Sequence, residues 1–182
     1  MRVTPTEIPD VRVLHVPRFG DHRGWFSELW RADQMPEAGI DAAFVQDNAS
    51  LSAEVGTLRG LHFQIPPRAQ GKLIRVVRGA IFDVAVDLRR SSSTFGRHVA
   101  VTLTAESGDQ LWVPAGFAHG FCTLEPATEV SYKVTDTYSQ AHDRGLRWDD
   151  PDLAIAWPCG EPHLSAKDRG HPGLKDLPAW FA

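Results

Sequence analysis

Between residues 71 and 138 the chain alternates short apolar runs with turns, and this pattern constrains the fold more than any other feature. The runs span residues 73–77, 80–88, 111–114, 121–124 and 129–134, and Ser107-Gly108-Asp109 is typical of a turn between two of them. Val99, Val101 and Leu103 alternate with polar or small residues, which is the period-two pattern of a half-buried strand. Strands of this length and spacing predict an all-β fold, either a sandwich or a jelly-roll barrel.

The flanking segments add little regular structure. We predict helices only at Arg31–Ala38 and Leu174–Trp180, and an irregular tail from Asp150 onward that wraps the barrel. The segment Gly24–Trp30 could add a strand to its own sheet or to that of a neighbouring molecule. Because no internal repeat or linker divides the chain, residues 1–182 are predicted to form a single domain.

Composition excludes several classes of function. The net charge of −4 and the pI near 6.0 argue against nucleic acid as a general partner. No stretch approaches the roughly 20 apolar residues that span a bilayer, and residues 1–5 lack the apolar core of a signal peptide. We therefore expect a cytoplasmic protein in which Cys122 and Cys159 remain free thiols.

Residues 108–119 fit the second sequence motif of the cupins, a glycine followed after five residues by P-x-G-x-x-H. The fold class predicted is thus a cupin-type jelly-roll barrel with a few short helices and an extended N-terminal strand segment. In metal-binding cupins the histidine of this motif, here His119, joins a cluster of metal ligands. The alternative for His119 is a buried histidine that is hydrogen-bonded in the core.

The run His62-Phe63-Gln64 weakens the metal interpretation. Side chains repeat every second residue on a strand, so a metal site there would require a second histidine at position 64. The amide of Gln64 is a poor ligand, and a site made only of His62 and His119 is the remaining metal alternative. Since the unperturbed pKa of histidine lies near physiological pH, His62 is instead predicted to carry protons.

Several short runs carry groups that could face a pocket, and each also has a structural explanation. Residues 21–28 are dense in charged and aromatic side chains around a glycine, as in a solvated loop. Residues 46–50 carry amides suited to a base edge or sugar hydroxyls, but are also typical of a turn. Arg59 could contact phosphate oxygens, and Lys72 beside His62 could stabilise an oxyanion.

Two further pairs complete the candidate site. Tyr132 and Tyr138 lie six residues apart, which would place them on one face of an unbroken strand. A phenol can donate a proton and an aromatic ring can stack on a base, although both could be ordinary strand tyrosines. Lys167 and Asp168 lie in the tail, where only tertiary structure could bring Asp168 to His62.

Together these motifs resemble the dTDP-4-dehydrorhamnose 3,5-epimerase family in colinear order over nearly the whole chain. The similar segments are Asp21-x-Arg23-Gly24-x-Phe26-x-Glu28, Gln46-Asp47-Asn48, Arg59-Gly60-Leu61-His62, Gly71-Lys72-Leu73, residues 82–89, residues 114–121, Tyr132-Lys133, Trp148-Asp149-Asp150-Pro151 and Ser165-x-Lys167-Asp168. The resemblance implies an epimerase that uses neither metal nor cofactor and acts on a dTDP-linked 4-keto-6-deoxysugar. It also implies a homodimer that exchanges N-terminal strands.

The resemblance further implies a role for each matching residue. His62 would be the base, oriented by Asp168, with Tyr132 as the acid on the opposite face of the sugar and Lys72 stabilising the enolate oxygen. The residues implied to bind the nucleotide sugar are Arg23, Phe26, Glu28, Gln46, Asp47, Asn48, Arg59, His119, Tyr138 (stacked on the thymine), Asp143 and Lys167. Asp143 occupies a position where the family commonly has glutamate, so its shorter side chain puts that contact in doubt.

Three alternatives remain open at this point. A relative that epimerises only carbon 3 or carbon 5 would share these motifs. A metal-dependent cupin oxygenase or isomerase would lose activity on chelation. A silent module that binds dTDP would exchange no hydrogen with its ligand, but such a module has no need of His62, Tyr132 and Lys72 together.

Overall fold

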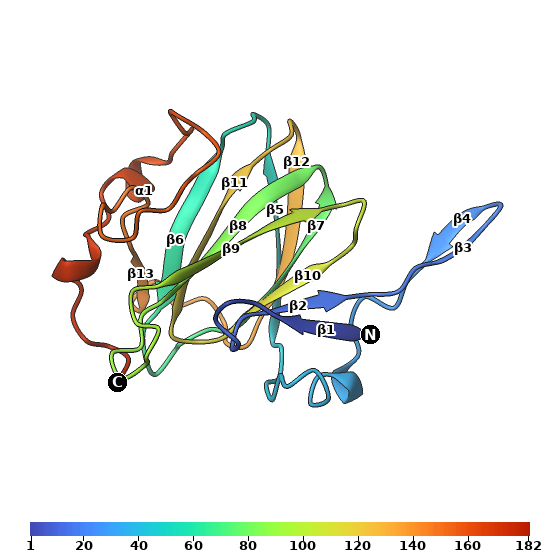
Figure 1. Cartoon of the computed structure of the whole chain (residues 1–182), viewed down its shortest axis with the longest axis horizontal. Coiled ribbons are helices and arrows are strands. Elements are labelled where there is room, and N and C mark those ends of the chain that lie inside the picture. The colour runs from blue at the N-terminus through green and yellow to red at the C-terminus, as the bar shows by residue number, and fades with distance from the viewer.

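The structure, a computed structural model, describes residues 1–182 and is built almost entirely from antiparallel strands (Figure 1). One sheet has six strands in the order β1-β2-β10-β7-β12-β5. Their bounds are β1 Arg2–Pro5, β2 Arg12–His15, β5 Gln46–Ser52, β7 Lys72–Arg78, β10 Gln110–Val113 and β12 Thr128–Val134. The second sheet has five strands in the order β13-β6-β11-β8-β9. These are β6 Leu58–Gln64, β8 Ala80–Asp87, β9 His98–Thr104, β11 Phe117–Thr123 and β13 Asp143–Gly145.

The two sheets pack face to face over the main apolar core. Thirteen buried residues form this core, including Ile74 and Val76 from β7 and Ile81 and Ala85 from β8. Because these residues are an even number of positions apart along each strand, their side chains point to the same face, toward the core. The prediction of an all-β jelly-roll barrel is confirmed, and β11 begins at Phe117, four residues earlier than expected.

Two further segments cover the outer faces of the sheets. Residues 30–44 pack on the six-stranded sheet, where Met35 and Ile40 are buried against Leu14, Leu73 and Trp112. The C-terminal tail covers the five-stranded sheet through residues such as Leu153, Leu174 and Leu177, and Figure 1 shows it beside β6 and β13. By packing there, the tail brings Asp168 next to His62 on β6.

The predicted helices are shorter than expected, and one helix was missed. Only the 3-10 turns η1 (Ala32–Gln34) and η2 (Leu174–Asp176) form within the two predicted segments. The tail, predicted to be irregular, contains the short helix α1 (Ala166–Arg169). Ser165 caps α1, since its Oγ accepts a hydrogen bond from the backbone N–H of Asp168 at 3.1 Å. No helix of the structure has the length and apolar character needed to cross a membrane.

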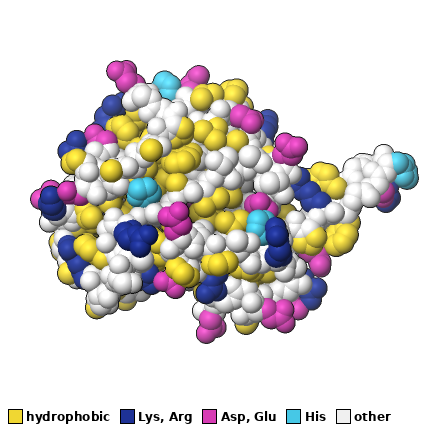
Figure 2. Space-filling model, viewed as in Figure 1, with side chains coloured by type: hydrophobic (Ala, Val, Ile, Leu, Met, Phe, Trp, Pro, Cys, Tyr) yellow, Lys and Arg dark blue, Asp and Glu magenta, His cyan; other side chains and the backbone are white.

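A two-stranded hairpin formed by β3 (Phe19–Asp21) and β4 (Gly24–Phe26) stands clear of the barrel (Figures 1 and 2). Only β4 falls within the segment Gly24–Trp30 that was predicted to add a strand, and the hairpin pairs with neither main sheet of its own chain. Phe19, Trp25 and Phe26 on this hairpin are 61%, 59% and 65% exposed. Three large apolar side chains on one projecting element form an unusual exposed surface.

Candidate active site

Most of the predicted site residues line one cavity of about 270 Å³ between the two sheets. Its walls come from β5, β7 and β12 on one side and from β6 and β13 on the other, with loops closing the rim. The predicted residues in its lining are Gln46, Asn48, His62, Lys72, Tyr132, Tyr138, Asp143 and Lys167. The barrel therefore brings together residues that lie up to 121 positions apart along the chain (46 to 167).

The place of His62 depends on a close contact between β6 and β11. A Cβ on Gly60, whose φ is +126°, would lie 2.6 Å from the Cα of Gly120, so only glycine fits there. The strand register shifts between His119 and Phe121, and His62 becomes the direct partner of His119. This irregularity sets the two histidines next to each other across the sheet.

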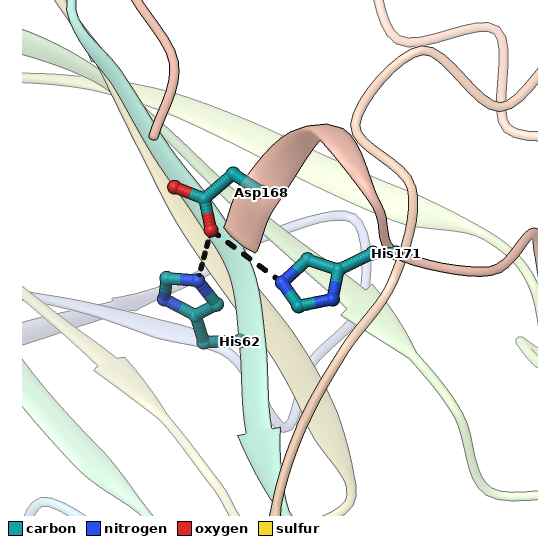
Figure 3. Close-up of side chains that lie close together, drawn as sticks. All are labelled: His62, Asp168 and His171. Carbon is teal, nitrogen blue, oxygen red and sulfur yellow. Dashed lines mark hydrogen bonds and ion pairs between the residues drawn. The ribbon is translucent and has the colours of Figure 1, made fainter. Parts of the chain in front are cut away.

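His62 is held by a carboxylate from the tail, as Figure 3 shows. Its Nε2 lies 2.5 Å from Oδ1 of Asp168, and the Asp168 side chain is 4% exposed. Burial lowers the pKa of His62 below its usual value, while Asp168 opposes that shift, and Lys72 and Lys167 add to it. The imidazole is therefore neutral at pH 7 and able to accept a proton.

Lys72 is a buried cation in the same cavity. Its Nζ donates a hydrogen bond to the backbone carbonyl of His62 at 3.1 Å. Burial lowers the pKa of Lys72 to about 8, and the neighbouring carboxylates of Asp83 and Asp143 oppose this effect. Lys72 thus remains positively charged at neutral pH in a site where a charge is poorly screened.

Tyr132 faces His62 from the opposite sheet. It lies on β12, next to Asn48 on β5 and Ile74 on β7, and both Tyr132 and His62 line the cavity. Burial raises the pKa of the Tyr132 phenol, and the nearby Arg59 moderates this effect. The phenol therefore keeps its proton at neutral pH and can donate it.

Tyr138 reaches the cavity from a loop rather than from a strand. β12 ends at Val134, so the argument from even spacing does not apply to Tyr138. Its backbone N–H donates to Oε1 of Gln46 at 2.9 Å, and the next N–H, of Ser139, donates to Oε1 of Gln64 at 2.6 Å. The two glutamines clamp this loop, and the amide at position 64 has a structural task in place of metal binding.

Asp143 connects two other predicted binding residues. Its Oδ2 accepts a hydrogen bond from the Tyr138 hydroxyl at 3.2 Å and pairs with the ammonium of Lys167. The shorter side chain at this position is thus engaged with protein partners at the rim of the cavity. It holds the tyrosine ring and the lysine in fixed relative positions.

His119 is not among the residues that line the cavity, and it forms a buried pair with Asp83, which was not among the predicted site residues. Nε2 of His119 lies 2.7 Å from Oδ1 of Asp83, which has no solvent exposure. Asp83 also attracts the Lys72 charge. The signal in the sequence was a carboxylate within the apolar run 80–88, because a buried charge needs partners of this kind.

Two predicted residues of the barrel point elsewhere. Asp47 lies on the opposite face of β5 from Gln46 and Asn48, and its Oδ2 is 2.6 Å from Nζ of Lys133. Arg59 donates hydrogen bonds to Ser52 Oγ and to the carbonyl of Leu51, both at 3.0 Å. Arg59 acts on the site through its charge near Tyr132.

Three predicted binding residues lie outside the cavity of their own chain. Arg23 and Phe26 are on the projecting hairpin, and Glu28 follows it. Arg23 pairs with Asp21 at 2.5 Å, and Glu28 lies 3.7 Å from Arg31, all at the surface. The single chain therefore does not bring these side chains to His62.

One group of side chains has ligand atoms close enough to share a metal ion. Those of His62, Asp168 and His171 lie within 4.8 Å of one another. Zinc bonds of about 2.0–2.2 Å would hold neighbouring ligand atoms about 3 Å or more apart. Because Nε2 of His62 and Oδ1 of Asp168 are only 2.5 Å apart, their geometry is that of a hydrogen bond.

Comparison with known proteins agrees with this geometry. Residues 5–176 match the family model described as dTDP-4-dehydrorhamnose 3,5-epimerase. The chain is 54% identical over 175 residues to the dTDP-4-dehydrorhamnose 3,5-epimerase of Sinorhizobium fredii, which covers 96% of this chain and 90% of that protein. It is 37% identical over 170 residues to a dTDP-4-dehydrorhamnose 3-epimerase of Streptomyces niveus, which covers 93% of this chain and 82% of that protein.

A solved structure is similar over the same length. The dTDP-6-deoxy-D-glucose-3,5-epimerase of Legionella pneumophila, crystallised in complex with dTDP-4-keto-L-rhamnose, superimposes with a TM-score of 0.93. Its sequence is 42% identical, and the match covers 98% of this chain and 95% of that one. Fold and sequence therefore point to the same group of enzymes.

Proposed function

The chain belongs to the dTDP-4-dehydrorhamnose 3,5-epimerase family, and from that premise we propose how its residues carry out the reaction. The protein is an isomerase that epimerises dTDP-4-dehydro-6-deoxy-D-glucose at carbons 3 and 5, giving dTDP-4-dehydro-L-rhamnose. One observation carries the assignment of roles. A neutral histidine and a protonated tyrosine from opposite sheets line one cavity, and a buried lysine lies between the same walls.

The chemistry needs a base, an acid and a cation. Hydrogens on the two carbons beside a ketone are acidic, because the electron pair left by the proton moves to the ketone oxygen as an enolate. His62 takes the proton, and Lys72 stabilises the charge on that oxygen. Tyr132 then gives a proton to the same carbon from the opposite face, which inverts it. Each inversion breaks and re-forms one C–H bond without oxidation or reduction.

The rim of the cavity is suited to the nucleotide. The Tyr138 ring, 58% exposed and fixed by its clamped loop, stacks on the thymine in this proposal. Asn48 and Gln46 contact the sugar or the base, Lys167 supplies positive charge near the diphosphate, and Arg59 adds its charge from near Tyr132. His119 acts on the site through its pair with Asp83, which lies close to Lys72.

The projecting hairpin completes the site in a homodimer. The hairpin has exposed aromatic side chains and does not pair with the barrel of its own chain, which favours its packing on the barrel of a second copy of the protein. Arg23, Phe26 and Glu28 would then contact the nucleotide sugar in the partner's cavity, and Asp47 would lie near this junction. We place the reaction in the cytoplasm, which agrees with two cysteines that remain thiols.

The identity of the product tests this function. Purified protein is incubated with dTDP-4-dehydro-6-deoxy-D-glucose, and proton NMR determines the configuration at carbons 3 and 5. Inversion at both carbons supports the double epimerase. Inversion at only one carbon would assign the protein to the single-carbon epimerases. An unchanged sugar would mean that the protein binds the nucleotide sugar without catalysing the reaction.

A further inference from the structure

The proposed reaction does not use one histidine that lies beside the base. His171 follows α1, and its Nε2 is 3.4 Å from Oδ1 of Asp168, the oxygen that also faces His62 (Figure 3). The His171 side chain is 10% exposed, and its Nε2 is buried without a hydrogen bond, so that the ion-pair contact with Asp168 is its nearest polar interaction. A buried ring nitrogen is unfavourable unless a polar group faces it, and the carboxylate of Asp168 is the group that does so.

The backbone makes room for this ring. A Cβ on Gly145 would lie 2.1–2.3 Å from atoms of the His171 imidazole, so the ring occupies the space that any other residue would fill. Gly145 is the strand partner of His62. The rings of His62 and His171 meet edge to face, with centroids 5.6 Å apart. Both imidazoles therefore face the same carboxylate oxygen of Asp168, and Gly145 leaves the space that the His171 ring occupies.

We propose that His171 is a positioning residue of the base: its Nε2–H holds Oδ1 of Asp168 in the orientation that receives Nε2–H of His62. This inference rests on the proposed function, since it assigns a task within the same site. A carboxylate oxygen has two lone pairs, and two N–H donors on one oxygen fix its direction. With its Nε2–H held by Asp168, His62 presents Nδ1 as the atom that accepts the proton from the substrate.

Two substitutions separate the hydrogen bond from the packing. His171→Phe keeps a ring over Gly145 but has no N–H donor, whereas His171→Gln restores a donor with a different shape. His163→Phe is the matched control, because His163 lies in the same tail and contributes only backbone hydrogen bonds. Thermal melting of each variant establishes that it is folded before activity is measured.

The expected result is a loss in kcat without a loss in binding. A hydrogen bond to a charged group is worth enough that His171→Phe should lower kcat about tenfold, with KM changed by less than about twofold. His171→Gln should recover most of the loss, and His163→Phe should match the wild type. Equal losses in the Phe and Gln variants, or full activity in His171→Phe, would overturn the proposal.

A spectroscopic measurement tests the same point independently of turnover. In nitrogen-15 NMR of the wild type, His62 should be the tautomer that carries its proton on Nε2. His171→Gln should keep this tautomer, and His171→Phe should populate the other one. If the protein turned over no substrate, this result would still decide the role of His171. An unchanged His62 signal in His171→Phe would contradict that role.

Discussion

Nε2 of His62 lies 2.5 Å from Oδ1 of Asp168, although the two residues are 106 positions apart along the chain. Burial by itself would raise the pKa of Asp168, but the neighbouring His171, His62 and Ser165 outweigh this effect and hold the pKa well below its usual value. The carboxylate is therefore ionised throughout the physiological range. In the proposed reaction this carboxylate orients His62 and stabilises the imidazolium that forms when His62 takes a proton.

The activity should depend on the charge of Lys72. A lysine is cationic below its pKa and neutral above it, and the pKa of Lys72 is about 8. We expect kcat to fall as the pH rises through about 8, because the enolate then loses its countercharge. Lys72→Met should lower kcat by about 10²–10³-fold and remove this limb of the pH profile. A Lys72→Met enzyme with the same alkaline limb would show that another group titrates there.

Removing the Tyr132 hydroxyl should separate exchange from inversion. In Tyr132→Phe the base remains, so the substrate in heavy water should still acquire deuterium from His62 on its original face. Epimerised product should fall by about 10²–10⁴-fold, the usual contribution of a general acid. Mass spectrometry of recovered substrate and NMR of product measure the two quantities separately. Product formed at the wild-type rate would remove Tyr132 from the acid role.

The Gln64 clamp should govern nucleotide binding rather than chemistry. Gln64→Leu leaves the backbone N–H of Ser139 without its acceptor and frees the loop that carries Tyr138. We expect KM to rise about tenfold with kcat little changed, since an unsatisfied buried donor costs about 1–3 kcal/mol. Tyr138→Leu is the reference, because it removes the stacking ring itself. A fall in kcat alone would place Gln64 in the chemical step.

The sequence predicts the strands of the barrel better than it predicts the C-terminal tail. The inward positions of β9 follow from the alternation of Val99, Val101 and Leu103, and β7 and β8 follow from their apolar runs, which are buried along most of their length. The roles of His62, Lys72 and Tyr132 could be proposed from the motifs that surround them. Asp47 shows the limit of that reasoning. It sits within a run of polar residues, but one step along a strand turns its side chain to the opposite face.

The tail could not be predicted in the same way. Residues 150–182 have no periodic pattern, so neither α1 nor the ring of His171 had a register from which it could be placed. Only tertiary packing brings Asp168 and His171 to β6. Arg23 and Phe26 also lie away from the cavity of their own chain. In our proposal they reach a site only in the dimer, where a second molecule covers the exposed aromatic side chains of the hairpin.

Mixed dimers should reveal that the hairpin serves the partner's cavity. His62→Asn and Arg23→Ala homodimers should each be impaired, because every site lacks one required group. After the two variants exchange subunits, a heterodimer with crossed hairpins contains one site with both residues intact. Activity should then rise above the sum of the separate variants. If the mixture is no more active than its components, the hairpin does not complete a neighbouring site.

Deuterium incorporation tests proton abstraction by His62 most directly. Wild-type protein and His62→Asn are each incubated in heavy water with dTDP-4-dehydro-6-deoxy-D-glucose, and the label at each sugar carbon is determined by NMR. The wild type should introduce deuterium at carbons 3 and 5. The variant should introduce none while still binding dTDP. Label that accumulates in the variant at the wild-type rate would contradict the account.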